Sequence, residues 1–181
     1  MITEPCNSSL ELVKDLFPNE EWIPTESNVW VAKSRLSQEK KELKKWEREM
    51  SQVRILTSRG SFAYFLPEIE IKGKNGRRSA DLVLDGEVVE MKTITGGRET
   101  LGGKFKHGYN QGALLVKNCS ITKKHSVFIR LLSELSIGSV KSKIAGELKH
   151  RFNEGTFICF FERIGELHIW TYEKLRSIIG T

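Results

Sequence analysis

Apolar residues recur along residues 34–58 at the spacing of one helix face. They stand three, four or seven positions apart, and Gly60 follows the last of them. Glycine just beyond the last periodic residue is a common end of a helix. The pattern therefore predicts a long helix from Ser34 to about Ser58, with an apolar stripe that comprises Leu36, Leu43, Trp46, Met50, Val53 and Leu56.

Three short apolar segments follow this helix, and each has the composition of a strand. Residues 61–66 are rich in aromatic side chains. Residues 80–84 and 87–93 flank Asp85-Gly86, a dipeptide that is the strongest short-range signal for a two-residue hairpin turn. We therefore predict one strand followed by a β-hairpin.

The second half of the chain alternates between helical and extended patterns. A glycine-rich link is predicted to lead into a helix over about 104–117. The elements predicted after it are a strand at 126–132, a helix at 139–152, strands at 156–162 and 167–172, and a short final helix. Helix, three strands, helix, strand, helix, strand is an order that indicates an α/β sandwich with a mixed sheet.

The composition is that of a folded protein. Of the 181 residues, 39% are hydrophobic, and no stretch approaches the ~20 consecutive apolar residues of a membrane-spanning helix. The three cysteines lie far apart and form no CxxC pair. This spacing disfavours a disulfide framework or a zinc site of paired cysteines, and it fits a reducing compartment.

Charge is distributed unevenly along the sequence. Lysine and arginine number 29 against 23 acids, a net charge of +6. Residues 31–60 and 101–181 carry net charges of +5 and +7, whereas residues 61–100 carry −1. Basic flanks around a middle that contains carboxylates suit an enzyme that acts on nucleic acid. The alternative is that the basic residues serve only solubility.

The N-terminal region differs from the rest of the chain. Its first 30 residues carry a net charge of −5. A short helix is predicted to run from Ser8 or Ser9 to Phe17, before two prolines break the chain. We therefore predict an accessory helix and linker over 1–33, and an α/β domain over 34–181.

The predicted hairpin places three charged residues on one face. With a two-residue turn, Asp81 pairs with Glu90, and directly paired side chains share a sheet face with β-carbons about 5 Å apart. Lys92 lies two residues beyond Glu90 and projects onto the same face. Facing carboxylates destabilise a sheet unless a positive charge lies between them. The register therefore predicts that Asp81, Glu90 and Lys92 converge.

Such a set of side chains can serve phosphodiester chemistry. Two carboxylates supply the hard oxygen ligands that Mg²⁺ or Mn²⁺ prefers. The metal polarises a phosphodiester and lowers the pKa of bound water, and a nearby ammonium stabilises charge that develops on the phosphate. The alternative is a solvated hairpin face on which Lys92 merely pairs with Glu90. The opposed Asp81, the apolar reverse face and the basic flanks favour a site.

At this point the sequence resembles a known group. Asp81, eight intervening residues and Glu90-Met91-Lys92 resemble the D…(E/D)xK signature of the PD-(D/E)xK nuclease superfamily. The predicted order of elements is similar to the αβββαβ core of that superfamily. The resemblance implies a PD-(D/E)xK-like three-layer sandwich, with a central mixed β-sheet flanked by helices.

A narrower resemblance is to C-terminal toxin domains of contact-dependent growth inhibition and related polymorphic toxin systems, several of which are tRNA nucleases. It adds two acids, Glu49 on the first long helix and Glu68 in Leu66-Pro67-Glu68 at the end of a strand. An acid at position 49, on or beside an apolar stripe, is unusual unless it is partnered. For each acid an ordinary role stays open: Glu49 pairing with Lys45, and Glu68 as a loop acid.

The resemblance implies roles for these residues. Mg²⁺ or Mn²⁺ would be bound by Asp81, Glu90 and Glu68, and the catalytic set would comprise Glu49, Glu68, Asp81, Glu90 and Lys92. It also implies RNA, particularly tRNA, in preference to DNA as the substrate, and a cognate immunity protein as a partner. The chain would then act in the cytoplasm as part of a larger toxin delivered from another cell.

Polar and basic residues gather at the start of the predicted helix 104–117. Those expected to contact nucleic acid, on the superfamily's pattern, are Lys104, Lys106, His107 and Gln111. Lys104, His107 and Gln111 are spaced to share one helix face. The glycine stretches at 96–98 and 102–104 are predicted to form a mobile loop whose amides and basic side chains approach a nucleic-acid backbone.

Four functions are open from the sequence. The leading hypothesis is a metal-dependent nuclease that cleaves RNA. The chain is alternatively a DNA endonuclease of a mobile element or phage, or a non-catalytic nucleic-acid-binding module on the same fold. A protein-interaction domain that docks through its acidic first 30 residues is the fourth.

Overall fold

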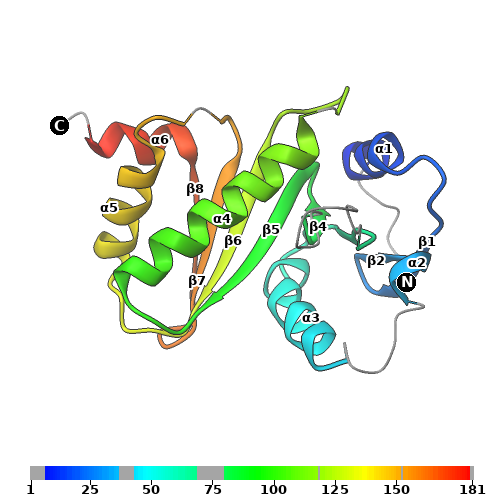
Figure 1. Cartoon of the computed structure of the whole chain (residues 1–181). Coiled ribbons are helices and arrows are strands. Elements are labelled where there is room, and N and C mark those ends of the chain that lie inside the picture. The colour runs from blue at the N-terminus through cyan, green and yellow to red at the C-terminus, as the bar shows by residue number, and fades with distance from the viewer. Residues whose placement is uncertain (1–6, 37–42, 69–79, 118, 152, 180–181) are drawn as a thin grey trace, which may run out of the picture. The chain divides into compact units, whose positions relative to one another are not determined.

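A computed structural model describes residues 7–36, 43–68, 80–117, 119–151 and 153–179. The chain divides into two compact units. The first comprises residues 1–88 with 118–122, and the second comprises 89–117 with 123–181. Figure 1 shows the helices and strands of both along the chain, and each unit is described by itself.

In its described residues, the first unit combines short strands with three helices. Its helices are α1 (Asn7–Leu16), α2 (Lys33–Leu36) and α3 (Leu43–Thr57), and its strands are β1 (Trp22–Glu26), β2 (Val29–Ala32), β3 (Ala63–Phe65) and β4 (Leu82–Leu84). The β1–β2 and β3–β4 pairs are antiparallel, whereas β2 and β3 run parallel with Trp30 opposite Tyr64. The rings of Trp30 and Tyr64 stack with centroids 4.9 Å apart. The pairing within this unit is therefore mixed.

Strands β1 and β2 lie in the segment that was predicted to be a linker. All four residues of β2 are buried, and Asn28 in the turn before it has a positive φ of 62°. The predicted long helix over 34–58 corresponds to α2 and α3, and residues 37–42 between them lie outside the described residues. Leu36, expected on the buried stripe, is 47% exposed, while its neighbour Arg35 is buried.

The Asp85-Gly86 turn is confirmed. Asp85 and Gly86 both have positive φ angles, 47° and 83°, as a type I′ turn requires. The turn joins β4 directly to β5 (Glu87–Ile94). The Asp85 carboxylate accepts a hydrogen bond from the backbone N–H of Phe62 at 2.8 Å. Asp85 therefore forms the turn through its backbone conformation and binds the backbone of Phe62 through its side chain.

The second unit is an α/β arrangement built on β5 and the elements after it. These are α4 (Arg98–Val116), β6 (His125–Leu131), α5 (Ile137–Leu148), β7 (Thr156–Phe161), β8 (Glu166–Thr171) and α6 (Tyr172–Arg176), followed by a 3₁₀ turn at Ser177–Ile179. Strands β6 and β7 are parallel and are connected through α5, and β7 and β8 are antiparallel. The α/β class and the mixed pairing of strands are thus confirmed.

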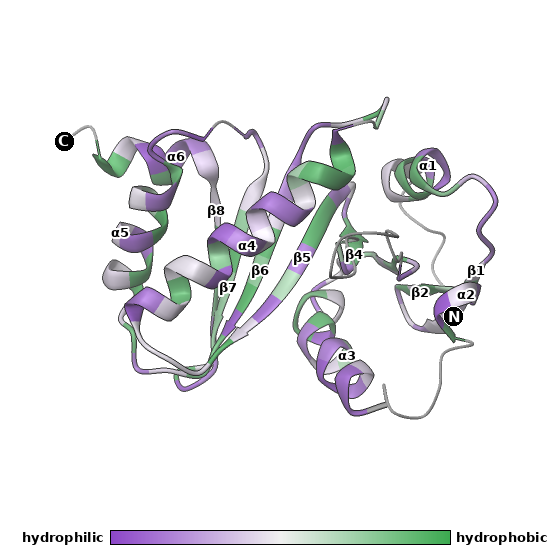
Figure 2. Cartoon of the chain, in the orientation of Figure 1, coloured by the Kyte–Doolittle hydropathy of each residue, from purple (hydrophilic) through white to green (hydrophobic). Residues whose placement is uncertain are grey.

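The core of the second unit lies between its strands and its helices. Figure 2 shows hydrophobic colouring along β5 and β6, while α4 alternates between hydrophobic and hydrophilic segments. The helix α4 contributes Leu101, Phe105 and Tyr109 to this core, where they meet aromatic and aliphatic residues of β6, β7, α5 and α6. Phe105 packs edge-on against Phe157 with ring centroids 5.6 Å apart.

The start of α4 corrects the sequence-based prediction. The helix begins at Arg98 and includes Gly102 and Gly103, which were expected in a mobile loop. Gly102 is buried because α4 packs closely on α5: a Cβ at this position would lie 2.2 Å from Cε of Lys143. Gly102 therefore lies against the ends of the Lys143 and Glu147 side chains of α5.

Candidate functional site: two clusters of carboxylates and cations

Three of the predicted acids belong to the first unit. Glu49 lies on α3, Glu68 follows β3, and Asp81 immediately precedes β4. The side chains of Glu49 and Glu68 are nearly buried, with 13% and 7% of their surface exposed. Carboxylates this deeply buried need positive partners.

Arg35 of α2 supplies one of those partners. Its Nη2 lies 2.5 Å from Oε2 of Glu49 and 3.9 Å from Oε1 of Glu68. Its Nη1 donates hydrogen bonds to the backbone carbonyls of Leu66, at 2.9 Å, and Asp81, at 3.2 Å. One guanidinium therefore contacts the side chains of two predicted acids and the backbone of the third.

Lys45 supplies the second partner, one helical turn before Glu49. Its Nζ lies 2.7 Å from Oε1 of Glu68 and 3.6 Å from Oε1 of Glu49. The predicted ordinary pairing of Glu49 with Lys45 is thus present, and it belongs to a larger network. Lys45 is 41% exposed, so its end of the network reaches solvent.

The protonation of Glu49 reflects this setting. Burial raises the pKa of Glu49 above its usual value. The positive charge of Arg35 opposes that rise in pKa, and the nearby negative charge of Asp81 adds to it. Asp81 and Glu49 are therefore close enough to influence each other electrostatically.

Glu90 and Lys92 form the second cluster, in the second unit. Both residues lie on β5, where Glu90 is 3% exposed and the Lys92 side chain is 17% exposed. The Lys92 ammonium donates to Oε1 of Glu90 and to Oε1 of Gln111 on α4, the latter at 3.2 Å. The predicted proximity of Glu90 and Lys92 is confirmed, and Gln111 joins them.

A glycine brings α4 close to Glu90. A Cβ at Gly108 would lie 3.2 Å from Cγ of Glu90 and 3.2 Å from Cγ1 of Val127. Helix α4 can therefore approach β5 and β6 closely, which places Gln111 within hydrogen-bonding distance of Lys92. The sequence analysis did not assign a role to Gly108.

The basic residues of α4 fall on two faces. His107 is exposed at the surface, but the protein around it removes part of its hydration, and this, together with the charges of Lys92 and Lys104, lowers its pKa below the usual value. Lys104, His107 and Gln111 thus share the face that looks toward Lys92, as their spacing predicts. Lys106 is exposed as well, but two positions from Lys104 it points to another side of the helix.

The donor atoms suit a hard divalent cation. All the predicted metal ligands are carboxylates, which Mg²⁺ and Mn²⁺ prefer. Within the described residues, no group of three or more His, Cys, Asp or Glu side chains is arranged to hold a metal ion. In the first unit, Arg35 and Lys45 already neutralise Glu49 and Glu68. The carboxylate chemistry fits such a metal, whereas Arg35 and Lys45 compete with it for Glu68, which is one of the three predicted ligands.

Arg35 is the residue of this site that the sequence analysis missed. It was counted only as part of a basic flank. Its guanidinium lies over the rings of Trp46 and Phe65, with Cζ 5.7 and 5.2 Å from the ring centroids. The signal in the sequence is weak, because its partners lie up to 46 positions further along the chain.

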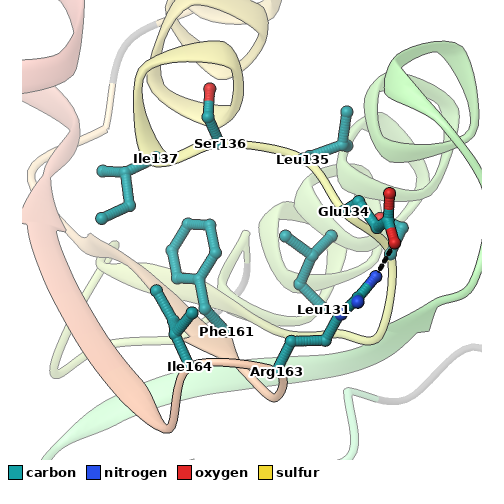
Figure 3. Close-up of a pocket in the computed structure, with 9 residues that line it drawn as sticks. Leu131, Glu134, Leu135, Ser136, Ile137, Phe161, Arg163 and Ile164 are labelled. Carbon is teal, nitrogen blue, oxygen red and sulfur yellow. Dashed lines mark hydrogen bonds and ion pairs between the residues drawn. The ribbon is translucent and has the colours of Figure 1, made fainter.

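A separate pocket lies in the second unit, between the start of α5 and the β7–β8 turn. Its volume is about 520 Å³, and Figure 3 shows the apolar side chains of Leu131, Phe161 and Ile164 lining it. Glu134 and Arg163 form an ion pair at its edge. Its lining includes none of the residues predicted from the sequence, so it is distinct from both clusters.

The fold and the clusters define an α/β protein whose buried carboxylates are each matched by basic side chains. No protein-family model and no curated protein matches the sequence. A solved structure to which the chain is similar is the CdiA-CT/CdiI toxin and immunity complex from Burkholderia pseudomallei, with 14% sequence identity and a TM-score of 0.49. The match covers 75% of this chain and 90% of that one. A likeness of this degree carries no argument about function.

Among the described residues, no helix combines the length and the hydropathy needed to cross a bilayer.

Proposed function

We propose that the chain is a divalent-metal-dependent nuclease, a hydrolase of phosphodiester bonds with a PD-(D/E)xK-like three-layer fold. The observation that carries the proposal is the buried Glu90 carboxylate bound to the Lys92 ammonium on β5. These two residues are the E and K of the Glu-x-Lys signature, and the type I′ turn that precedes them matches the predicted hairpin.

The proposed roles follow from the chemistry of each side chain. Asp81, Glu90 and Glu68 would hold Mg²⁺ or Mn²⁺, and Glu49 would assist. The metal, when bound, would supply a Lewis acid for the phosphodiester. Lys92 would position the attacking water or stabilise negative charge on the phosphate. The meeting of Asp81 with Glu90 rests on the register that a two-residue turn sets.

The substrate and partner are proposed from the resemblance of the motifs. RNA, particularly tRNA, is the proposed substrate in preference to DNA, and an immunity protein is the proposed partner. The chain would act in the cytoplasm as part of a toxin delivered from another cell. The exposed Lys104 and Lys106, with His107 and Gln111, would contact the nucleic acid.

Cleavage assays with matched variants test the proposal. The purified chain is incubated with total RNA and with plasmid DNA, in Mg²⁺, Mn²⁺ or EDTA. Asp81→Asn and Lys92→Gln are expected to lower the cleavage rate by at least about 100-fold. Asp85→Asn is the control for the first variant, because Asn-Gly also favours a type I′ turn.

Each outcome selects one of the functions open from the sequence. Loss of tRNA that needs a divalent metal supports the proposal, and loss of plasmid alone selects a DNA endonuclease. Salt-sensitive binding without any metal-dependent cleavage selects a nucleic-acid-binding module. If the chain neither binds nor cleaves nucleic acid, the result selects a protein-interaction domain. Full activity in folded Asp81→Asn or Lys92→Gln would overturn the assignment of residues.

A further inference from the structure

Arg35 is a buried charge in a helix of four residues. It is 8% exposed, although both neighbours in the sequence, Ser34 and Leu36, are exposed. Burying a guanidinium is costly by several kcal/mol unless hydrogen bonds and a counter-charge compensate it. The local sequence therefore does not explain why Arg35 points inward, and its partners must.

Those partners are parts of the proposed site. Nη2 pairs with Glu49 at 2.5 Å, and Nη1 donates to the carbonyls of Leu66 and Asp81. The carbonyl of Asp81 also accepts a hydrogen bond from the backbone N–H of Leu66, at 3.0 Å. Arg35 thus bridges the backbone at Asp81 to the backbone just before Pro67-Glu68.

Two aromatic rings pack around the guanidinium of Arg35. Trp46 of α3 and Phe65 of β3 both face it, and their own rings pack with centroids 4.7 Å apart. A planar group held against rings can aim several N–H bonds at once, which a lysine ammonium on a flexible stem cannot do. The geometry requires an arginine rather than any positive charge.

We propose that Arg35 is a positioning residue, which holds Asp81, Glu49 and the Leu66-Pro67-Glu68 segment in the arrangement that the proposed nuclease uses. The inference rests on the proposed function. Arg35 itself would not contact the substrate. It acts through the backbone of Asp81 and the carboxylate of Glu49, and Lys45 completes the network at Glu68.

The test replaces Arg35 by lysine and compares it with a matched surface change. Arg35→Lys keeps the positive charge that Glu49 needs but loses the fork of donors. Arg54→Lys is the control, because Arg54 lies in α3 of the same unit and binds Glu26 with both Nε and Nη2 at a site where its side chain is 56% exposed. The free energy of unfolding of both variants is measured by urea titration.

Two readouts follow in the folded variants. Amide hydrogen exchange at Leu66, whose N–H binds the Asp81 carbonyl, is expected to be at least about 10-fold faster in Arg35→Lys at equal global stability. For cleavage, kcat is expected to fall about 10- to 100-fold with KM unchanged, because a misplacement of about 1 Å in a catalytic group has effects of this size. Arg54→Lys is expected to change neither.

The outcomes separate this inference from the nuclease proposal. If the wild type cleaves and Arg35→Lys has the same kcat, the positioning role of Arg35 is overturned and the nuclease proposal stands. If the wild-type chain does not cleave, the nuclease proposal is overturned, and amide exchange at Leu66 decides whether Arg35 orders the backbone at Asp81. Exchange in Arg35→Lys equal to that of the wild type would overturn the inference about Arg35. If Arg35→Lys does not fold in buffer, the same two readouts are measured for it and for the wild type in a stabilising osmolyte such as sucrose, with the same criteria.

Discussion

Lowering the pH should destabilise the second unit through His125. This residue begins β6, is 4% exposed and packs in a T-shaped arrangement against Tyr109, with ring centroids 4.6 Å apart. Burial lowers the pKa of His125 from 6.5 to about 4, and the nearby carbonyls of Lys123 and Tyr109 offset only part of this effect. Neither ring nitrogen makes a well-aligned hydrogen bond within the described part of the chain.

The size of the effect follows from the two pKa values. The folded-state pKa is depressed, so the stability associated with a neutral His125 is fully present above about pH 6.5 and is lost as the pH falls toward 4. Because the unfolded chain takes up the proton first, the loss is about 2 kcal/mol at pH 5. Below pH 4 it levels off at about 3 kcal/mol.

Urea titrations at about pH 8 and about pH 5 measure this loss. His125→Leu removes the titrating group and is expected to lose about 2 kcal/mol less than wild type between the two pH values. His150→Leu makes the same change at an exposed position after α5 and serves as the control variant. Equal pH dependence in wild type and His125→Leu would refute the reasoning, because every other titrating group is common to both.

Two further predictions concern packing and nucleic-acid contacts. Gly155→Ala would place a methyl group 2.3 Å from the carbonyl oxygen of His125, so its free energy of unfolding, measured by thermal denaturation, should fall by about 2 kcal/mol or more. At Gly146 nothing lies within 4 Å of the added methyl group, so Gly146→Ala should raise the free energy of unfolding by about 0.5 kcal/mol. Equal changes in the two variants would contradict this prediction. Lys104→Gln should reduce the slope of log RNA affinity against log salt by about 1, while Lys174→Gln on α6 should not; equal slopes in anisotropy titrations would exclude a phosphate contact at Lys104.

The parts of the fold that the sequence predicts are those with local causes. Asp85-Gly86 favours its own turn, and the periodicity of α5 is visible in residues 137–148. The strand β1 was missed because Pro24 argues against a strand. Pro24 is tolerated there because β1, among the strands that the structure describes, is an edge strand that pairs only with β2. Gly102 favours a loop in the sequence for a similar reason, whereas in the structure it lies within α4 and contacts side chains of α5.

The candidate site also combines contacts that follow from local sequence with one that depends on the tertiary structure. Glu90 and Lys92 are two positions apart on one strand, so their contact follows from the alternation of side chains. Gln111 lies on a helix face that spacing alone identifies. Arg35 could not be found this way, because its burial depends on Glu49, Leu66 and Asp81, which only the tertiary structure brings to it.

The route of the chain through its first unit has a consequence for folding during synthesis. After α4, residues 119–122 return to that unit, where Asp15 of α1 accepts hydrogen bonds from the Cys119 thiol and from the N–H and hydroxyl of Ser120. A ribosome must therefore complete α4 before α1 has all its partners. A fragment that ends at Val88 would lack this return segment, so the two units cannot be separated by a single cut.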